Sequence, residues 1–152
     1  RWLLGEEPIE VLATGSCLVA PEIGALGDID TAMVILKTAS GKLCQISCSR
    51  RAVYGYDQRL EAFGSGGMLR ADNVVQNTVE LADTDGFHGA KPPYFFIERY
   101  ADAYRCELDH FAACVHEGRQ PSPNGRDGRQ ALALADAAVE SLATGRAVKP
   151  QA

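Results

Sequence analysis

The sequence predicts an α+β domain: an open, mostly antiparallel sheet with helices on one face. Its 152 residues are 46% hydrophobic and 23% charged, a composition typical of one globular domain with a buried core. Short apolar runs separated by turn signals fill the first half of the chain, and longer runs with helical periodicity fill the second half. Strands followed by helices are typical of α+β domains rather than of alternating α/β folds.

The first half predicts a meander of five or six strands. Residues 9–19 alternate between apolar and polar side chains, as in a half-buried strand. The unbroken apolar run from Ala32 to Leu36 predicts a strand covered on both faces. Ser40-Gly41 predicts a hairpin turn, and Gly64-Ser65-Gly66-Gly67 a second turn, whereas residues 21–27 read as a loop. The expected strands cover residues 9–19, 31–38, 42–49, 58–64, 68–71 and 78–82.

The second half predicts two amphipathic helices. The first carries an apolar stripe from Ile97 to Val115 and ends at Gly118. The second runs to Gly145, with Asp127 and Gln130 expected as its capping pair. Its expected buried stripe consists of Ala131, Leu134, Ala135, Ala138 and Leu142. Val148 then returns to the sheet or begins a last short strand.

Charge and cysteine content exclude several classes of partner. A net charge of −5 argues against nucleic acid, because phosphate binding needs a basic surface. No apolar run reaches the ~20 residues of a membrane helix, and no signal peptide is apparent. Five cysteines without a CxxC pair read as buried, reduced thiols of a cytoplasmic protein.

The residues do not predict a complete catalytic site in this chain. Gly64-Ser65-Gly66-Gly67 lacks the third glycine of a dinucleotide fingerprint and precedes a strand instead of a helix, so no cofactor-binding residue is expected. His110 and His116 read as solvated helix positions, and His88 as part of a glycine-flanked loop. No histidine stands at a metal-ligand spacing, so no metal site is expected either.

Two segments stand out as candidates for ligand binding. Residues 49–59 concentrate arginine, tyrosine and Asp57 where two strands meet, and these are the groups that a polyol needs for its hydroxyls. A surface strand end with paired charges is an equally good interpretation. In residues 91–100, two prolines fix the approach to the long helix, and the aromatic side chains read as core.

The first residues read as the last turn of a helix closed by Gly5. A single turn cannot nucleate alone, so we expect further helical residues before Arg1 and a truncated chain.

At these segments the sequence resembles the inositol 2-dehydrogenases, within the larger glucose–fructose oxidoreductase, inositol dehydrogenase and rhizopine catabolism group. The string Val53-Tyr54-Gly55-Tyr56-Asp57-Gln58-Arg59-Leu60-Glu61-Ala62-Phe63-Gly64 is the specific part. Phe96-Ile97-Glu98-Arg99-Tyr100 is similar to the start of the family's first C-terminal helix, and residues 128–145 to its last helix. Residues 1–6 are similar to the end of the helix between the family's two domains.

The resemblance implies the C-terminal domain of a two-domain Rossmann oxidoreductase. Residues 1–8 would end the inter-domain helix, and residues 9–152 would form a substrate-binding and oligomerisation domain. The Rossmann domain that binds NAD, and the catalytic lysine, aspartate and histidine, would precede Arg1, so no catalytic residue is expected in this chain. The implied reaction oxidises one hydroxyl of myo-inositol to a ketone.

Substrate contact is the function that the resemblance carries onto this chain. Tyr54 and Tyr56 match the family's tyrosines at the strand end, and Tyr100 and Glu98 match its residues at the helix start. Tyr56 is the first choice for a substrate-binding residue. Asp57 is a further candidate, because a carboxylate can accept hydrogen bonds from the hydroxyls of a polyol. The resemblance also implies a tetramer built through open sheet faces. Two alternatives remain: another sugar or cyclitol as substrate, and a non-catalytic assembly or ligand-binding module.

Overall fold

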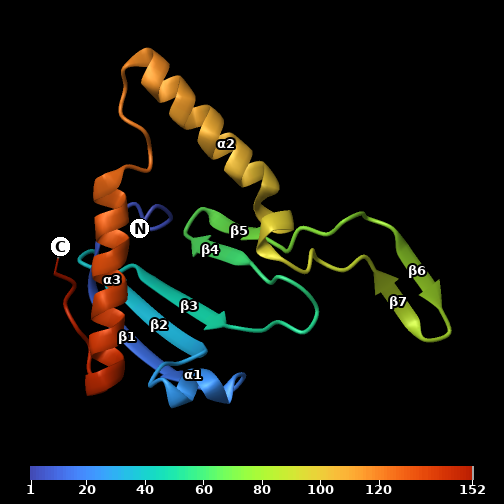
Figure 1. Ribbon diagram of the computed structural model, residues 1–152, viewed down its shortest axis with the longest axis horizontal. Coiled ribbons are helices and arrows are strands. Elements are labelled where there is room, and N and C mark those ends of the chain that lie inside the picture. The colour runs from blue at the N-terminus through green and yellow to red at the C-terminus, as the bar shows by residue number, and fades with distance from the viewer. Residues whose placement is uncertain (152) are drawn as a thin grey trace. The chain divides into compact units, whose positions relative to one another are not determined.

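The computed structural model describes residues 1–151 and divides them into two compact units (Figure 1). The first unit comprises residues 1–51 and 122–151, and the second comprises residues 52–121. Elements of the first unit are β1 (Pro8–Ser16), α1 (Pro21–Ala25), β2 (Thr31–Thr38), β3 (Leu43–Ser49) and α3 (Gly125–Thr144). Elements of the second are β4 (Leu60–Gly64), β5 (Gly67–Ala71), β6 (Glu80–Asp83), β7 (Gly86–Gly89) and α2 (Phe96–Glu117).

The sheet of the first unit is antiparallel, in the order β1-β2-β3. Its register aligns Val11 with Leu36 and Leu36 with Cys44, so these three side chains share one face. The helix α3 covers that face, as Figure 1 shows, and Ala137 of α3 packs into the same core cluster as Val11 and Leu36. This arrangement confirms an antiparallel sheet with a helix on one face.

A close approach between β1 and α3 occurs at Gly15. A Cβ atom there would lie 2.4 Å from the Cδ1 atom of Ile29 and 3.5 Å from that of Leu142. The missing side chain leaves room for Ile29, because atoms in a packed core cannot approach to 2.4 Å, whereas 3.5 Å to Leu142 is an ordinary van der Waals contact.

The strand β1 ends earlier than its alternating pattern predicts. The backbone N–H groups of Leu18, Val19 and Ala20 each donate to the Asp30 carboxylate at 2.8 Å. These groups are therefore satisfied by a side chain instead of a neighbouring strand, and the chain leaves the sheet. The expected loop that follows contains the single-turn helix α1, with Pro21 at its first position, where a missing N–H costs nothing.

The helix α3 begins at a different capping pair from the one predicted. The Asn124 side chain accepts from the N–H groups of Arg126 and Asp127, and the Asp127 carboxylate accepts from the Asn124 N–H. The expected pair of Asp127 and Gln130 is wrong, because Asn124 is the residue outside the helix with a short acceptor side chain. The predicted end at Gly145 is confirmed, with that residue in the left-handed conformation.

The buried face of α3 is also rotated from the predicted stripe. Ala133, Ala137 and Ser141 are buried, whereas Ala131 and Ala135 are exposed. Ser141 is fully buried: its Oγ accepts from the Ala13 N–H at 2.9 Å and donates to the Arg146 carbonyl at 2.6 Å. A polar residue at the centre of the contact is invisible to a purely apolar pattern.

The ends of the first unit agree with the predicted local structure. The Gly5 N–H donates to the Arg1 carbonyl at 2.9 Å, and Gly5 has a φ of 61°, so a helical turn ends there as expected. Val148 forms an isolated antiparallel bridge with Val11, which matches the predicted return to the sheet.

The second unit holds two separate hairpins, β4-β5 and β6-β7, and the long helix α2. The predicted turn at Gly64–Gly67 joins β4 to β5, and α2 ends at Gly118 as predicted. The expected single meander is wrong, because the described strands form three sheets. His88 lies in β7 and not in a loop: its Nε2 is 3.2 Å from the Asp83 Oδ1 across the hairpin.

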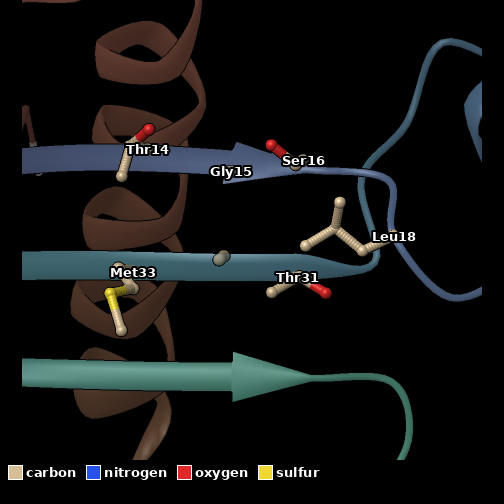
Figure 2. A pocket seen from close by; sticks show the side chains of 7 residues that line it. Thr14, Gly15, Ser16, Leu18, Thr31 and Met33 are labelled. Carbon is tan, nitrogen blue, oxygen red and sulfur yellow. The ribbon is translucent and has the colours of Figure 1, made fainter.

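One face of the first unit's sheet is open. Figure 2 shows the side chains of Thr14, Thr31 and Met33 on the face that points away from α3, around a depression of about 150 Å³. Met33 and Ile35 are 48% and 49% exposed, so β2 is not covered on both faces as its apolar run predicted. Within residues 1–151, no helix is long and apolar enough to cross a membrane.

Candidate functional site

Two segments of the second unit are held together by a backbone contact at Gly55. The Tyr56 N–H donates to the Pro93 carbonyl at 2.8 Å. Gly55 is buried with a φ of +134°, and a Cβ there would lie 2.9 Å from the carbonyl oxygen of Pro92. Glycine therefore brings the tyrosine-rich segment directly against the residues that lead into α2.

Asp57 is the centre of a hydrogen-bonded group of side chains. Its Oδ2 accepts from the Tyr54 hydroxyl at 2.7 Å and from Arg59 Nη2 at 2.9 Å. Its Oδ1 accepts from Arg59 Nε at 2.8 Å and from Asn73 Nδ2 at 2.7 Å. Each oxygen thus has two donors, which uses the capacity of the carboxylate in full.

A chain of tyrosine rings lies in the same unit. The rings of Tyr56 and Tyr100 meet edge to face with centroids 5.6 Å apart, and Tyr100 meets Tyr104 in the same way at 6.2 Å. The Arg99 guanidinium carbon lies 5.5 Å from the centre of the Tyr100 ring. Tyr56 and Tyr100 are half-buried, so each ring is packed while part of it stays accessible.

Hydrogen bonds within the site shift the pKa values of Asp57, Tyr54 and Tyr100. Arg59, followed by Tyr54 and Asn73, holds the pKa of Asp57 far below its usual range, because all three donate to the ionised carboxylate. The bond to Asp57 raises the pKa of Tyr54, and a bond to Tyr56 raises that of Tyr100. Phenols with raised pKa values act as hydrogen-bond partners near neutral pH, and not as general bases.

The predicted site residues do not all share one network. Tyr54 and Asp57 are bonded to each other, and Tyr56 and Tyr100 form the ring contact. Glu98 lies exposed in the first turn of α2, where a negative charge also favours the helix dipole.

Two expectations about neighbouring side chains are wrong. Tyr94, Phe95 and Ile97 are 81%, 49% and 57% exposed, so these aromatic and apolar residues do not form the expected core. His110 is half-buried and not solvated, with its Nε2 3.4 Å from the Cys114 Sγ.

The expectation that the five cysteines are buried thiols is also wrong for most of them. Cys114 is buried, Cys17 and Cys44 are half-buried, and Cys48 and Cys106 are exposed.

Sequence reasoning missed Asn73. Its Oδ1 accepts from the Gln58 N–H at 2.7 Å, while its Nδ2 donates to Asp57. The signal was present in the predicted turn at Gly64–Gly67, because counting outward from it pairs Leu60 with Ala71 and then places Gln58 opposite Asn73. Tyr104 was missed as a site residue because its helical spacing reads as part of an apolar stripe.

The described residues do not offer a dinucleotide cradle. Gly64–Gly67 is a hairpin turn between two strands, so the helix N-terminus that receives a pyrophosphate is missing there. Residues 1–151 also contain no group of three or more histidine, cysteine, aspartate or glutamate side chains that could hold a metal ion.

A family of known proteins shares this chain's sequence over nearly its full length. The family model described as "Oxidoreductase family, C-terminal alpha/beta domain" matches residues 1–149. The chain belongs to this family. The match agrees with the predicted fold class, an α+β domain with an antiparallel sheet and a helix on one face.

Several individual proteins and solved structures are similar to nearly the whole of this chain. The chain is 52% identical over 149 residues to the myo-inositol 2-dehydrogenase of Thermotoga maritima, covering 98% of this chain and 45% of that protein. A crystal structure of a myo-inositol dehydrogenase from Corynebacterium glutamicum matches with a TM-score of 0.90 at 45% identity, covering 96% of this chain and 44% of that one. A myo-inositol dehydrogenase from Lactobacillus casei, solved with NAD(H) and myo-inositol, matches with a TM-score of 0.83 at 27% identity, covering 99% and 44%. The chain therefore spans less than half the length of these relatives.

Proposed function

We propose that this chain is the C-terminal, substrate-side domain of an NAD-dependent inositol 2-dehydrogenase that oxidises myo-inositol to a keto-inositol. The tyrosine and aspartate residues of the second unit carry the proposal: the Asp57 carboxylate orients the Tyr54 hydroxyl, and the rings of Tyr56 and Tyr100 pack against each other. Such groups suit a cyclitol, which presents hydroxyls around its rim and C–H groups on its faces.

Each residue has a distinct role in the proposal. Tyr56, Tyr54 and Tyr100 contact the substrate, and Glu98 accepts a hydroxyl proton in a hydrogen bond at the helix start. Asp57 stays a predicted binding residue, but its filled hydrogen-bonding capacity favours a positioning role, in which it aims the Tyr54 hydroxyl. No group of this chain is assigned to proton abstraction, because the raised pKa values of Tyr54 and Tyr100 keep both phenols protonated.

The proposal places NAD outside this chain. The Lactobacillus casei relative was solved with NAD(H), and the hairpin turn at Gly64–Gly67 does not suit a pyrophosphate. We infer that a Rossmann domain N-terminal to Arg1 holds the cofactor, that residues 1–8 end the helix between the domains, and that residues 9–152 bind substrate and assemble the oligomer. Free cysteines support a cytoplasmic location.

The open sheet face is proposed to assemble the protein. Leu12, Met33, Ile35 and Leu43 are between 40% and 70% exposed on the side away from α3. An antiparallel sheet with an apolar outer face is suited to pair with an identical face in a symmetric dimer, and a second, different contact between two such dimers would complete the proposed tetramer.

The activity is tested by supplying the full-length protein with NAD and a panel of polyols. We expect NADH formation with myo-inositol at the highest kcat/KM, because the first relatives that match are inositol dehydrogenases. Faster turnover of another cyclitol or a sugar would support the alternative substrate. No turnover of any polyol would contradict the proposal.

A non-catalytic module is the second candidate. Its support is that the described residues hold neither a dinucleotide cradle nor a metal cluster. The intact mass of the native protein separates the two functions: a species near 16.3 kDa would favour the module, whereas a mass more than twice as large would favour the enzyme.

A further inference from the structure

The side-chain amide of Asn73 joins two parts of the candidate site. Its Nδ2 donates to the Asp57 carboxylate and its Oδ1 accepts from the Gln58 N–H, both at 2.7 Å. Asn73 is half-buried in the segment after β5. Because the two ends of an amide have opposite polarity, the Asn73 side chain satisfies both partners at once.

Asp57 has few other fixed supports. Its remaining donors are Arg59, whose side chain is 60% exposed, and Tyr54, which is 50% exposed. Both are long side chains whose bonds compete with water. The Asn73 amide is instead anchored to the backbone at Gln58, so it fixes one oxygen of the carboxylate in place.

The orientation of Asp57 decides what Tyr54 presents. The single hydroxyl proton of Tyr54 goes to Asp57, so the lone pairs of the Tyr54 oxygen point away and can accept a bond from a ligand hydroxyl. If the carboxylate rotated, the Tyr54 hydroxyl would lose this acceptor and would adopt another orientation.

We propose that Asn73 is a positioning residue of the polyol site, which holds the Tyr54 hydroxyl in its binding orientation through Asp57. This inference rests on the proposed function and adds to it a residue that never touches the substrate. The competing account is that the amide only closes the base of the β4-β5 hairpin.

The decisive variant is Asn73→Asp in the full-length enzyme. It keeps the shape of the side chain and the acceptor for the Gln58 N–H, but it replaces the donor to Asp57 by an oxygen. Two carboxylates then face each other among Arg59, Tyr54 and Asp72, the other charged and titratable groups around them. We expect the KM for myo-inositol to rise about tenfold at pH 8, the effect of losing one charged hydrogen bond, with the KM for NAD unchanged.

The pH profile tests whether the lost donor to Asp57 causes the rise in KM. When the pH falls, one of the two facing carboxylates takes up a proton and restores a donor. The ratio of the variant's KM to the wild-type KM should therefore decrease from pH 8 toward pH 6. A rise in KM that does not depend on this donor would leave the ratio constant, and the Tyr54→Phe background described below separates positioning from hairpin closure.

Two further variants complete the test. Asn77→Asp makes the same charge change in the same segment, and its Oδ1 acceptor for the Val79 N–H is retained, so its KM should equal the wild-type value. In a Tyr54→Phe background, the Asn73→Asp penalty should shrink toward onefold, since the hydroxyl through which it acts is gone. If Asn73→Asp does not fold, Asn73→Ser is measured against the same background.

The outcomes separate this inference from the function on which it rests. Wild-type enzyme without polyol oxidation would overturn the proposed function. If the wild-type enzyme is active, two results would overturn the role of Asn73 alone. The first is an equal KM for myo-inositol in Asn73→Asp and Asn77→Asp. The second is an undiminished rise in KM for Asn73→Asp in the Tyr54→Phe background.

Discussion

Gly55 shows how one residue positions the candidate site. Its φ of +134° is rarely adopted by residues with a side chain, and its Cα faces the carbonyl oxygens of Pro92 and Pro93. The string of two tyrosines around a glycine was visible in the sequence. The reason for the glycine is its close contact with the backbone at Pro92 and Pro93. The sequence did not show this contact, because no local pattern identifies the partner of a glycine.

We predict that Gly55→Ala lowers the free energy of unfolding by about 1–3 kcal/mol through backbone strain, and raises the KM for substrate as Tyr56 moves from Pro93. Chemical denaturation and steady-state kinetics measure the two effects. Gly128→Ala is the control: it lies in α3 with open space around its Cα, so it should stabilise the protein by about 0.5–1 kcal/mol. Equal behaviour of the two variants would contradict the contact.

Asp30 organises the loop after β1. Backbone N–H groups of Leu18, Ala20 and Val19 hold its pKa far below the ordinary value, although burial acts in the opposite direction. A carboxyl whose pKa is depressed by folding stabilises the protein above its unfolded pKa of about 4, and this contribution is lost as the pH falls further.

We therefore predict that Asp30→Asn lowers stability at pH 7 and flattens its decline on acidification below about pH 4, because no proton uptake at residue 30 then accompanies unfolding. Thermal unfolding across pH measures this. Asp28→Asn serves as the control, since the exposed Asp28 accepts only from the next N–H. An unchanged slope in Asp30→Asn would count against the role of the carboxylate.

At the scale of elements, α3 is joined to β1 by a polar contact. Ser141 is 0% exposed and links the Ala13 N–H to the Arg146 carbonyl. Periodicity predicted the helix and its glycine end, because both follow from local sequence. The buried face was misplaced by about one residue, since small residues of α3 lie on several sides and only the tertiary contact selects among them.

Ser141→Ala should reduce the free energy of unfolding by about 1–3 kcal/mol, because the Ala13 N–H and the Arg146 C=O lose the fully buried hydroxyl that they share. Denaturant titration measures the change. Thr144→Ala removes a hydroxyl that bonds the Glu140 carbonyl on the exposed side, and should change stability by less than about 0.5 kcal/mol. A loss for Ser141→Ala no larger than this control would contradict the linking role.

At the scale of the whole molecule, the open sheet face and the tyrosine group lie in different units. The sequence predicted the antiparallel sheet, because alternation of apolar and polar residues is a local signal for half-buried strands. It did not predict that the strands separate into three sheets, because alternation within a strand contains no information about which strands pair.

Ile35→Glu tests the proposed assembly. Ile35 is 49% exposed, so the change should preserve the fold, whereas like charges facing each other across a symmetric contact should weaken association by roughly tenfold or more. Sedimentation over a concentration series measures this. Val139→Glu, at a 67% exposed position of α3, is the matched control and should leave the oligomer intact. An unaltered oligomer in Ile35→Glu would exclude this face as the interface.

The central claim is that the tyrosine group of residues 52–121 binds the polyol, and Tyr56→Phe in the full-length enzyme tests it most directly. Loss of one hydroxyl should raise the KM for myo-inositol about tenfold and leave the KM for NAD unchanged. Tyr94→Phe, at an 81% exposed position, should behave as wild type. A KM for myo-inositol that is the same in Tyr56→Phe, Tyr94→Phe and wild type would contradict the claim.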